Sequence, residues 1–384
     1  MTPEASKIEV RRYELAPAKL AGGGLISALH ANREGQLFLG LTGADEVLWR
    51  YDTDRGSATP LGMSWLSPGA RMVHRSLTED LEGNLYVGTS RLRWGMPDKL
   101  APHAGHTGHR AFMFAVRWID RLGSLAAVTE LFVLRRGGRD LVPLFHDLPG
   151  MVTATAWHEP THSLLILTGG RRLWAYRPGE GAPVQISFLG PHFHHAIGVD
   201  RVGRIWGLAR GRVLTSLELY LPPGKGSQLK ARRRATGTLP HPTPDRGRAA
   251  SGIDSWALAP DGRMFGGLRE DGSVFTLDPE SGTSARLGKP APEPRLSGLC
   301  AAPDGTIYLT AGIGRVMLFR IPPGGRLELL GPLVDADGTA CHAVHDLVAV
   351  STDRLYGGEF YPLDTPRPAP PSRPGCLWEI RLPS

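Results

Sequence analysis

Residues 82–88, with the sequence EGNLYVG, combine a two-residue turn signal with a short apolar run that ends in glycine. A Glu-Gly or Asp-Gly pair before alternating apolar residues is typical of a turn between two antiparallel strands. Six other segments follow the same pattern: 34–40 (EGQLFLG), 161–169 (THSLLILTG), 202–207 (VGRIWG), 261–266 (DGRMFG), 304–309 (DGTIYL) and 352–357 (TDRLYG). Their second turn positions are 35, 83, 162, 203, 262, 305 and 353, which gives intervals of 48, 79, 41, 59, 43 and 48 residues. The chain therefore contains seven copies of one short unit.

Seven copies at this spacing predict an all-β fold, a seven-bladed β-propeller formed by residues 1–384 as a single domain. Each four-stranded sheet has two apolar faces that neighbouring sheets must cover, so we expect the sheets to close into a ring. A row of unrelated hairpins is the alternative, and the seven-fold recurrence disfavours it. The next strands are expected at 48–52, 173–176, 274–278, 317–320 and 377–380. The last segment leaves too few residues for an outermost strand, so residues 7–13 (KIEVRRY) should pair with it and close the ring.

The composition agrees with a folded chain that is rich in turns. Gly 49 and Pro 33 among 384 residues indicate many turns and few long helices, and 41% hydrophobic residues are enough for a full core. No apolar run reaches the ~18 residues that a membrane span needs, and the first residues, MTPEASKIEVRRYELAP, lack the apolar stretch of a secretory signal. Three widely spaced cysteines, Cys300, Cys341 and Cys376, do not indicate a disulfide framework. We expect a cytoplasmic monomer, or a secreted protein if a leader was removed.

The two long intervals indicate insertions at about residues 91–125 and 221–250. In the first, residues 111–122 could form a short helix or extra strands. The second contains the densest basic cluster, residues 225–248 (KGSQLKARRRATGTLPHPTPDRGR), which supplies much of the net charge of +7. We interpret this cluster as a solvated loop, with a docking surface for a polyanion as the alternative. No zinc-finger, helix-turn-helix or RNA-binding pattern accompanies it, so nucleic acid is not the expected partner.

The innermost strand of each expected blade should start about eight residues before its turn. These starts are Ser27, Arg75, Ala154, His195, Asp254, Ser297 and His345. They would lie at equal depth around one axis, at the mouth where propellers usually bind ligands. Solvated strand starts would explain polar residues equally well. The gathering of histidines favours a functional site, because five of the 14 lie at or near these positions: His74, His194, His195, His342 and His345.

Histidines from two blades could also hold a divalent metal, because imidazole suits Zn²⁺, Mn²⁺ or Fe²⁺. The possible ligands are His194, His195, His342 and His345, although Cys341-His342-x-x-His345 is not a zinc signature on its own. A metal therefore stays an alternative, and no cofactor is required. Cys341 fits a half-buried structural thiol better than a nucleophile.

Several of these segments also resemble a known group of enzymes. Residues 74–77 (HRSL) before 82–89 (EGNLYVGT), and 345–347 (HDL), 353–359 (DRLYGGE) and 374–379 (PGCLWE), are similar to the inner blades of propeller polysaccharide lyases and rhamnosyl-glucuronate-cleaving enzymes. The resemblance covers most of the chain as a repeat. It implies cleavage of a uronic-acid-containing glycan, with His and Tyr as proton-transfer groups and Arg holding the carboxylate. No single tyrosine here matches the catalytic one.

The resemblance and the histidines together predict β-elimination on an acidic oligosaccharide or polysaccharide that could also contain rhamnose. The reaction needs a base, an acid and a cation beside the carboxylate. His195 and His345 are the candidate base and acid, His74 could take either role, and Arg75 would neutralise the carboxylate. The candidate substrate contacts are Asp254, His194 and His342.

Three alternatives to the predicted β-elimination at this mouth stay open. One is glycoside hydrolysis, and another is a non-catalytic propeller that binds a protein or glycan, because a propeller fold does not by itself imply function. The third is a site on the opposite face, near Arg91, Arg171, Arg269 and Glu359.

Overall fold

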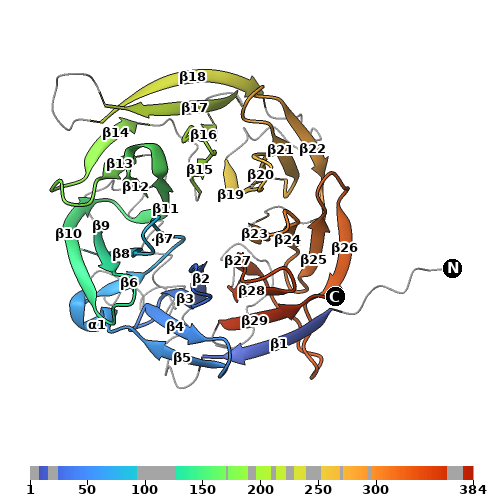
Figure 1. Ribbon diagram of the computed structural model, residues 1–384. Helices are drawn as coiled ribbons and strands as arrows, with labels where there is room; N and C mark the ends of the chain where they lie inside the picture. The colour runs from blue at the N-terminus through green and yellow to red at the C-terminus, as the bar shows by residue number, and fades with distance from the viewer. Residues whose placement is uncertain are drawn as a thin grey trace, which may run out of the picture. The chain divides into compact units, whose positions relative to one another are not determined.

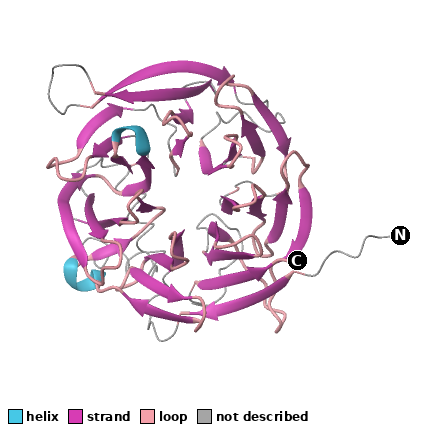
Figure 2. Cartoon of the chain, viewed as in Figure 1, coloured by secondary structure: helices cyan, strands magenta, loops and turns pink. Residues whose placement is uncertain are grey.

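The computed structural model describes residues 8–15, 25–92, 127–169, 172–188, 196–208, 213–221, 229–238, 252–268, 271–292, 296, 298–360 and 375–383. Within these ranges the chain is almost entirely strand (Figure 2), and its helical segments are the single turns Met63–Leu66 (α1) and Glu159–Thr161 (η2). The chain divides into two compact units. We call residues 13–186 with 358–377 the three-sheet unit, and residues 1–12 with 187–357 and 378–384 the four-sheet unit. The predicted all-β class is confirmed.

The three-sheet unit contains three sets of four antiparallel strands (Figure 1). The first is Leu25–Ala31 (β2), Leu37–Thr42 (β3), Leu48–Asp52 (β4) and Ser57–Pro60 (β5). The second is Leu77–Glu79 (β7), Leu85–Leu92 (β8), Ala127–Leu134 (β9) and Leu141–Pro149 (β10). The third is Val152–His158 (β11), Ser163–Thr168 (β12), Arg172–Tyr176 (β13) and Val184–Phe188 (β14). The short strand Ala70–Met72 (β6) pairs with β3 and β8 and so joins the first two sets.

The other four sheets have the same strand order. They are Gly198–Val199 (β15), Ile205–Leu208 (β16), Val213–Tyr220 (β17) and Lys230–Thr238 (β18), then Ile253–Leu258 (β19), Met264–Leu268 (β20), Val274–Leu277 (β21) and Ser284–Gly288 (β22). The sixth sheet is Gly298–Ala301 (β23), Ile307–Ala311 (β24), Met317–Ile321 (β25) and Glu328–Pro332 (β26). The seventh is Val344–Ala349 (β27), Arg354–Glu359 (β28), Cys376–Arg381 (β29) and Glu9–Glu14 (β1). The predicted pairing of the N-terminal strand with the last one is therefore confirmed, whereas closure of a ring stays a prediction.

Within each unit the innermost strands of successive sheets are neighbours. Strand β7 contacts both β2 and β11 in the three-sheet unit, and β15, β19, β23 and β27 follow one another in the four-sheet unit. Apolar side chains from adjacent sheets fill the space between them, as where Phe38 and Val73 pack with Val87 and Phe132. Successive sheets within a unit thus bury their facing sides against each other, as expected for propeller blades.

Five of the predicted turns share one set of backbone hydrogen bonds. The marker glycine donates its N–H to the carbonyl three residues earlier, and that earlier residue donates to the carbonyl after the glycine, with N···O distances of 2.8 to 3.2 Å. The glycines are Gly35, Gly83, Gly203, Gly262 and Gly305, whose φ angles lie between 78° and 92°. Because residues with a Cβ rarely adopt positive φ angles, glycine is the favoured residue at the marker position. The sequence pattern is confirmed as a turn with a defined geometry.

The polar residues near the starts of the inner strands are less accessible than expected. The pairing of the inner strand shifts register at Ser27 in β2, Thr153 in β11 and Asp254 in β19, which marks a β-bulge at each position. Ser27 is 3% exposed and Asp254 is fully buried, so the alternative interpretation of solvated strand starts is wrong at both positions. Ser27 shows the physical reason, because its Oγ lies 2.6 Å from Thr42 Oγ1 and 2.8 Å from the Val73 carbonyl. Hydrogen bonds inside the protein replace those to water.

The basic segment is also more ordered than expected. Residues 230–238 form β18, which pairs along its length with β17, so the interpretation of residues 225–248 as a solvated loop is wrong for this part. Arg232 donates to Glu218 at 2.8 Å and lies over the ring of Tyr220, which shows how charged residues are accommodated on an outer strand. Residues 93–126 of the first insertion, including 111–122, lie outside the described residues.

Candidate functional site

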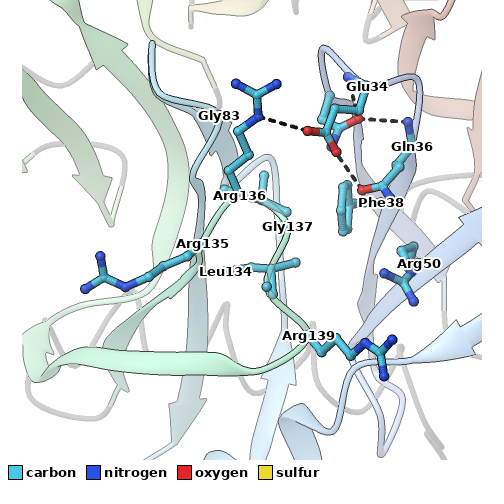
Figure 3. Close-up of a pocket in the computed structure, with 13 residues that line it drawn as sticks. Glu34, Gln36, Phe38, Arg50, Gly83, Leu134, Arg135, Arg136, Gly137 and Arg139 are labelled. Atoms are coloured by element: carbon cyan, nitrogen blue, oxygen red, sulfur yellow. Dashed lines mark hydrogen bonds and ion pairs between the residues drawn. The ribbon is translucent and has the colours of Figure 1, made fainter.

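A pocket of about 130 Å³ lies between the first two sheets of the three-sheet unit (Figure 3). Its walls come from three turns and one strand: the turn 32–36 between β2 and β3, the glycine of the turn 80–84 between β7 and β8, the turn 135–138 between β9 and β10, and β4. Phe38, Leu85 and Leu134 form a buried apolar base. The pocket is therefore an apolar floor surrounded by polar turns.

The turn between β9 and β10 supplies most of the positive charge. Its sequence is Arg135-Arg136-Gly137-Gly138, and the Gly138 N–H donates to the Arg135 carbonyl at 2.8 Å. Gly137 has a φ of 68°, and a Cβ on Gly138 would lie 2.9 Å from the Arg135 carbonyl oxygen. The two glycines thus allow a tight turn that projects Arg136 and brings the neighbouring Arg139 to the pocket.

Contacts between the turns hold the pocket walls together. The Arg136 backbone N–H donates to Asn84 Oδ1 at 3.2 Å, and Arg33 donates from Nη1 to the Leu81 carbonyl at 2.9 Å. The Arg33 N–H donates to Glu79 Oε2 at 3.2 Å. Burial alone would raise the pKa of Glu79, but the hydrogen bonds and charges of His30 and Arg33 outweigh burial and lower it. Glu79 is therefore held as a carboxylate that joins the first two sheets.

The pocket carries more positive than negative charge. Arg136 Nε lies 2.9 Å from Glu34 Oε1, and Figure 3 shows this pair on one side and Arg50 with Arg139 on another, whereas the side chain of Arg135 points away. Among the residues that the structure describes, no ion pair joins Arg50 or Arg139 to a carboxylate. A guanidinium offers several N–H donors in a planar fork that matches a carboxylate or phosphate. The arrangement can therefore bind an anionic group.

The amino-acid sequence alone does not indicate this pocket. Arg50, Arg136 and Arg139 lie in no recurring motif, and residues 50 and 136 are far apart along the chain. The Arg-Arg-Gly-Gly sequence at 135–138 was the available local signal, because two glycines after two arginines predict a tight, basic turn. Only the packing of one sheet against the next brings Arg50 to the same pocket.

Of the residues predicted for the mouth, His74 and Arg75 are half-buried between β6 and β7. His74 Nδ1 lies 3.1 Å from the Thr153 carbonyl. The Arg75 main chain joins three inner strands, because its N–H donates to the Ser27 carbonyl at 3.2 Å and its carbonyl accepts from the Thr155 N–H at 3.1 Å. Arg75 has a φ of 46°, a strained value for an arginine. Its main chain thus has a structural role, while the roles predicted for its side chain and for His74 stay predictions.

The predicted residues of the four-sheet unit are more buried. His345, the second residue of β27, is 3% exposed, and Asp254 lies at the bulge of β19. His342 is half-buried and its carbonyl accepts the Gly314 N–H at 2.7 Å. The burial of His345 also contradicts the alternative interpretation of a solvated strand start at this position. Its role as an acid or base, and those of Asp254 and His342 as substrate contacts, stay predictions.

His194 and His195 lie outside the described residues, and so do Arg171 and Arg269. Within the described ranges, no group of three or more His, Cys, Asp or Glu side chains is arranged to hold a metal ion. Burial, with a smaller contribution from Asp346, raises the pKa of the Cys300 thiol, which disfavours its reactive thiolate form. No described helix is long and apolar enough to cross a membrane.

A second polar cluster surrounds Arg91, one of the residues predicted for the opposite face. A bulge in β10 sets His146 and Asp147 against the single residue Glu130 of β9, and Asp147 has a φ of 67°. Glu130 is buried and accepts hydrogen bonds from Arg91 Nε at 3.0 Å and from the Ser67 hydroxyl. Its Oε1 also lies 3.3 Å from His146 Nδ1. Because Arg91 also pairs with Asp147 at 3.5 Å, its charge is already matched by carboxylates.

Comparison with solved structures identifies the fold. A catalytically inactive variant of virginiamycin B lyase from Staphylococcus aureus, solved with quinupristin, is 10% identical, with 98% of this chain and 100% of that chain covered and a TM-score of 0.60. The RRP9 WD40 repeats are 14% identical over 98% of this chain and 100% of that chain, with a TM-score of 0.60. YCF48 from Cyanidioschyzon merolae is 9% identical over 97% and 99%, with a TM-score of 0.56. All three are β-propellers. The chain has the β-propeller fold.

At these identities the likeness concerns the fold alone. The similar structures include a lyase and WD40 repeats, and they support the propeller part of the resemblance seen in the sequence without extending it to polysaccharide lyases. No protein-family model and no curated protein matches the chain. Because one fold hosts many functions, the residues of the propeller itself carry the information about its function.

Proposed function

We propose that this β-propeller is a binding protein that holds an acidic oligosaccharide by an anionic group in the pocket lined by Arg50, Arg136 and Arg139, which we call the arginine pocket. The observation that carries the proposal is the pair Arg50 and Arg139, two arginines at one pocket that no ion pair among the described residues joins to a carboxylate. Bringing like charges together costs electrostatic free energy, which a bound anion would recover. Charge-assisted hydrogen bonds from guanidinium groups to carboxylates are among the strongest in proteins.

The size and lining of the pocket favour one group of a larger, hydroxylated ligand. A volume of about 130 Å³ is below the range of about 300–1,000 Å³ typical of sites that enclose a whole small molecule. Beside the arginines, Asn32 and Gln36 hydrogen-bond through Asn32 Nδ2 and Gln36 Oε1 at 3.1 Å and keep further donor and acceptor capacity. Amide groups next to a guanidinium suit a uronic acid, whose carboxylate would bind the arginines while its hydroxyls bind the amides.

Calorimetric titration with a short oligogalacturonate, and with a neutral galactan oligosaccharide of equal length, tests the proposal. We expect binding of the acidic ligand alone, weakening with added salt because the contacts are between charges. Arg50→Ala and Arg139→Ala should each weaken binding by about tenfold or more, since each removes hydrogen bonds to a charged group.

Arg135→Ala is the matched control, because it also removes one guanidinium group close to the pocket, but the side chain of Arg135 points away from the pocket (Figure 3). It should keep the affinity within about twofold. Equal binding of the two oligosaccharides, or wild-type affinity in both the Arg50 and the Arg139 variants, would contradict the proposal.

A further inference from the structure

Glu34 is the carboxylate among the described residues that line the arginine pocket. Its Oε1 lies 2.9 Å from Arg136 Nε, the geometry that a ligand carboxylate would take on the same guanidinium. We propose that Glu34 is a built-in competitor, which occupies Arg136 in the free protein and is displaced by a second anionic group of the ligand. This inference rests on the proposed function and identifies the class of ligand that the pocket prefers.

The main chains of both partners are held in place, so the exchange concerns side chains alone. The Glu34 N–H donates to Asn32 Oδ1 at 3.1 Å, and the Arg136 N–H donates to Asn84 Oδ1 at 3.2 Å. Gly83 leaves room for the Arg136 side chain, because a Cβ there would lie 3.0 Å from Arg136 Cδ. A guanidinium on a fixed backbone can therefore exchange one carboxylate for another without movement of the turns.

The exposure of the pair makes the exchange possible. The side chains of Arg136 and Glu34 are 66% and 39% exposed, and solvent-exposed ion pairs contribute little to stability. Loss of the Glu34 contact is therefore a small cost, and an incoming carboxylate regains a similar interaction. A buried ion pair would instead resist displacement, because breaking it would leave an unpaired charge in an environment without water.

The consequence is a preference for ligands with repeated anionic groups. One group binds Arg50 and Arg139 without competition, whereas a second one must replace Glu34 on Arg136. A single uronic acid satisfies only the first contact, so a chain with uronic acids in succession should bind more tightly than the monomer. Glu34 also places a negative charge at the pocket, which disfavours ligands that cannot reach Arg136.

Calorimetry with galacturonate and with a short oligogalacturonate tests the role of Glu34 in four proteins: wild type, Glu34→Gln, Arg136→Ala and the double variant. Glutamine keeps the shape of the side chain and removes the competing charge. We expect Glu34→Gln to bind the oligomer about two- to fivefold more tightly, as expected from an exposed ion pair. This gain should vanish in the Arg136→Ala background, because there is no guanidinium left to release.

The possible failures are distinguishable. If the wild type binds the oligomer and Glu34→Gln binds it no more tightly, the competitor role is wrong while the pocket stands. A gain that persists in the Arg136→Ala background also overturns it, since Glu34 would then act only through its charge. If neither the wild type nor Glu34→Gln binds either ligand, the proposed function fails. Matched melting temperatures among the four proteins show that the variants are folded.

Discussion

Arg136 lies in the turn between β9 and β10 of the three-sheet unit, and Arg204 lies at one of the repeated turns of the four-sheet unit, and their surroundings differ. Arg204 Nε lies 2.6 Å from Asp200 Oδ2, its Nη2 lies 2.5 Å from Glu280 Oε1, and its guanidinium lies 6.0 Å from the ring centroid of Trp206. Among the residues that the structure describes, Arg136 has Glu34 alone as its carboxylate partner, at 2.9 Å. Burial would lower the pKa of Arg204, but Asp200 and Glu280 outweigh burial and raise it.

The difference separates a structural arginine from one suited to binding. Asp200 is buried and its carboxylate accepts four hydrogen bonds, from the Val202 and Arg204 N–H groups, Arg204 Nε and Trp206 Nε1. Two carboxylates and an aromatic ring thus neutralise and cover Arg204, which leaves little for a ligand to gain. The arginine pocket has the opposite balance, because its guanidinium groups outnumber its carboxylates.

The largest expected effect is a loss of stability at the site of Arg204, the structural arginine. Asp200→Ala should lower the free energy of unfolding by about 3 kcal/mol, because it leaves Arg204 and Trp206 Nε1 without a buried acceptor. Glu34→Ala should lower it by less than about 1 kcal/mol, the usual range for an exposed pair. Denaturant unfolding of both variants measures the difference. Equal losses in the two variants would remove the distinction between the two arginines.

A smaller effect is expected at the marker glycines. Gly83→Ala and Gly35→Ala should each cost about 1–2 kcal/mol, because both residues have φ near +80°. A Cβ on Gly83 would also lie 3.0 Å from Arg136 Cδ, whereas a Cβ on Gly35 would meet nothing within 4 Å. Gly83→Ala should therefore weaken oligogalacturonate binding as well as stability, while Gly35→Ala should affect stability alone. Identical binding by the two variants would show that Arg136 does not need this space.

The unfolding free energy should depend on pH through Glu79, the carboxylate that joins the first two sheets. The lowered pKa of Glu79 in the folded state means that its contribution is fully present above its ordinary pKa of 4.5 and is lost as the pH falls through the lowered value. Wild type should therefore exceed Glu79→Gln in unfolding free energy at pH 7, and the gap should narrow below pH 4.5. A gap that is constant with pH would mean that the charge of Glu79 does not matter.

The smallest effect is expected at Arg135, which shares a turn with Arg136 but points away from the pocket (Figure 3). Arg135→Ala should change the free energy of unfolding by no more than about 0.5 kcal/mol, as is usual for a surface substitution. Thermal and denaturant unfolding measure the change. A larger loss would indicate that Arg135 stabilises the turn. The turn that carries Arg136 would then depend on an arginine for its stability, which would weaken the distinction from Arg204.

The fold was readable in the sequence because its determinants are local. A marker such as Gly83 and the apolar run after it specify a turn and a strand within a few residues, and seven copies indicate the blades. The arginine pocket was not readable, because Arg50 and Arg136 meet only after two sheets pack together. The burial of Asp254 was not readable for a related reason. From sequence alone a polar residue is expected to be solvated, whereas Asp254 lies at the bulge in β19 and is buried.

The backbone hydrogen bonds of Arg75 have a consequence for cooperativity. In repeat architectures, each unit is stabilised by its own contacts and by those with its nearest neighbours. Arg75 adds main-chain hydrogen bonds that reach from Ser27 to Thr155, so one residue couples the innermost strands of three successive blades. Side-chain replacement leaves this coupling in place, and only proline at position 75 or 155 would remove a donor. The three blades should therefore open together, with the amides of Arg75 and Thr155 exchanging with solvent hydrogen at the same slow rate.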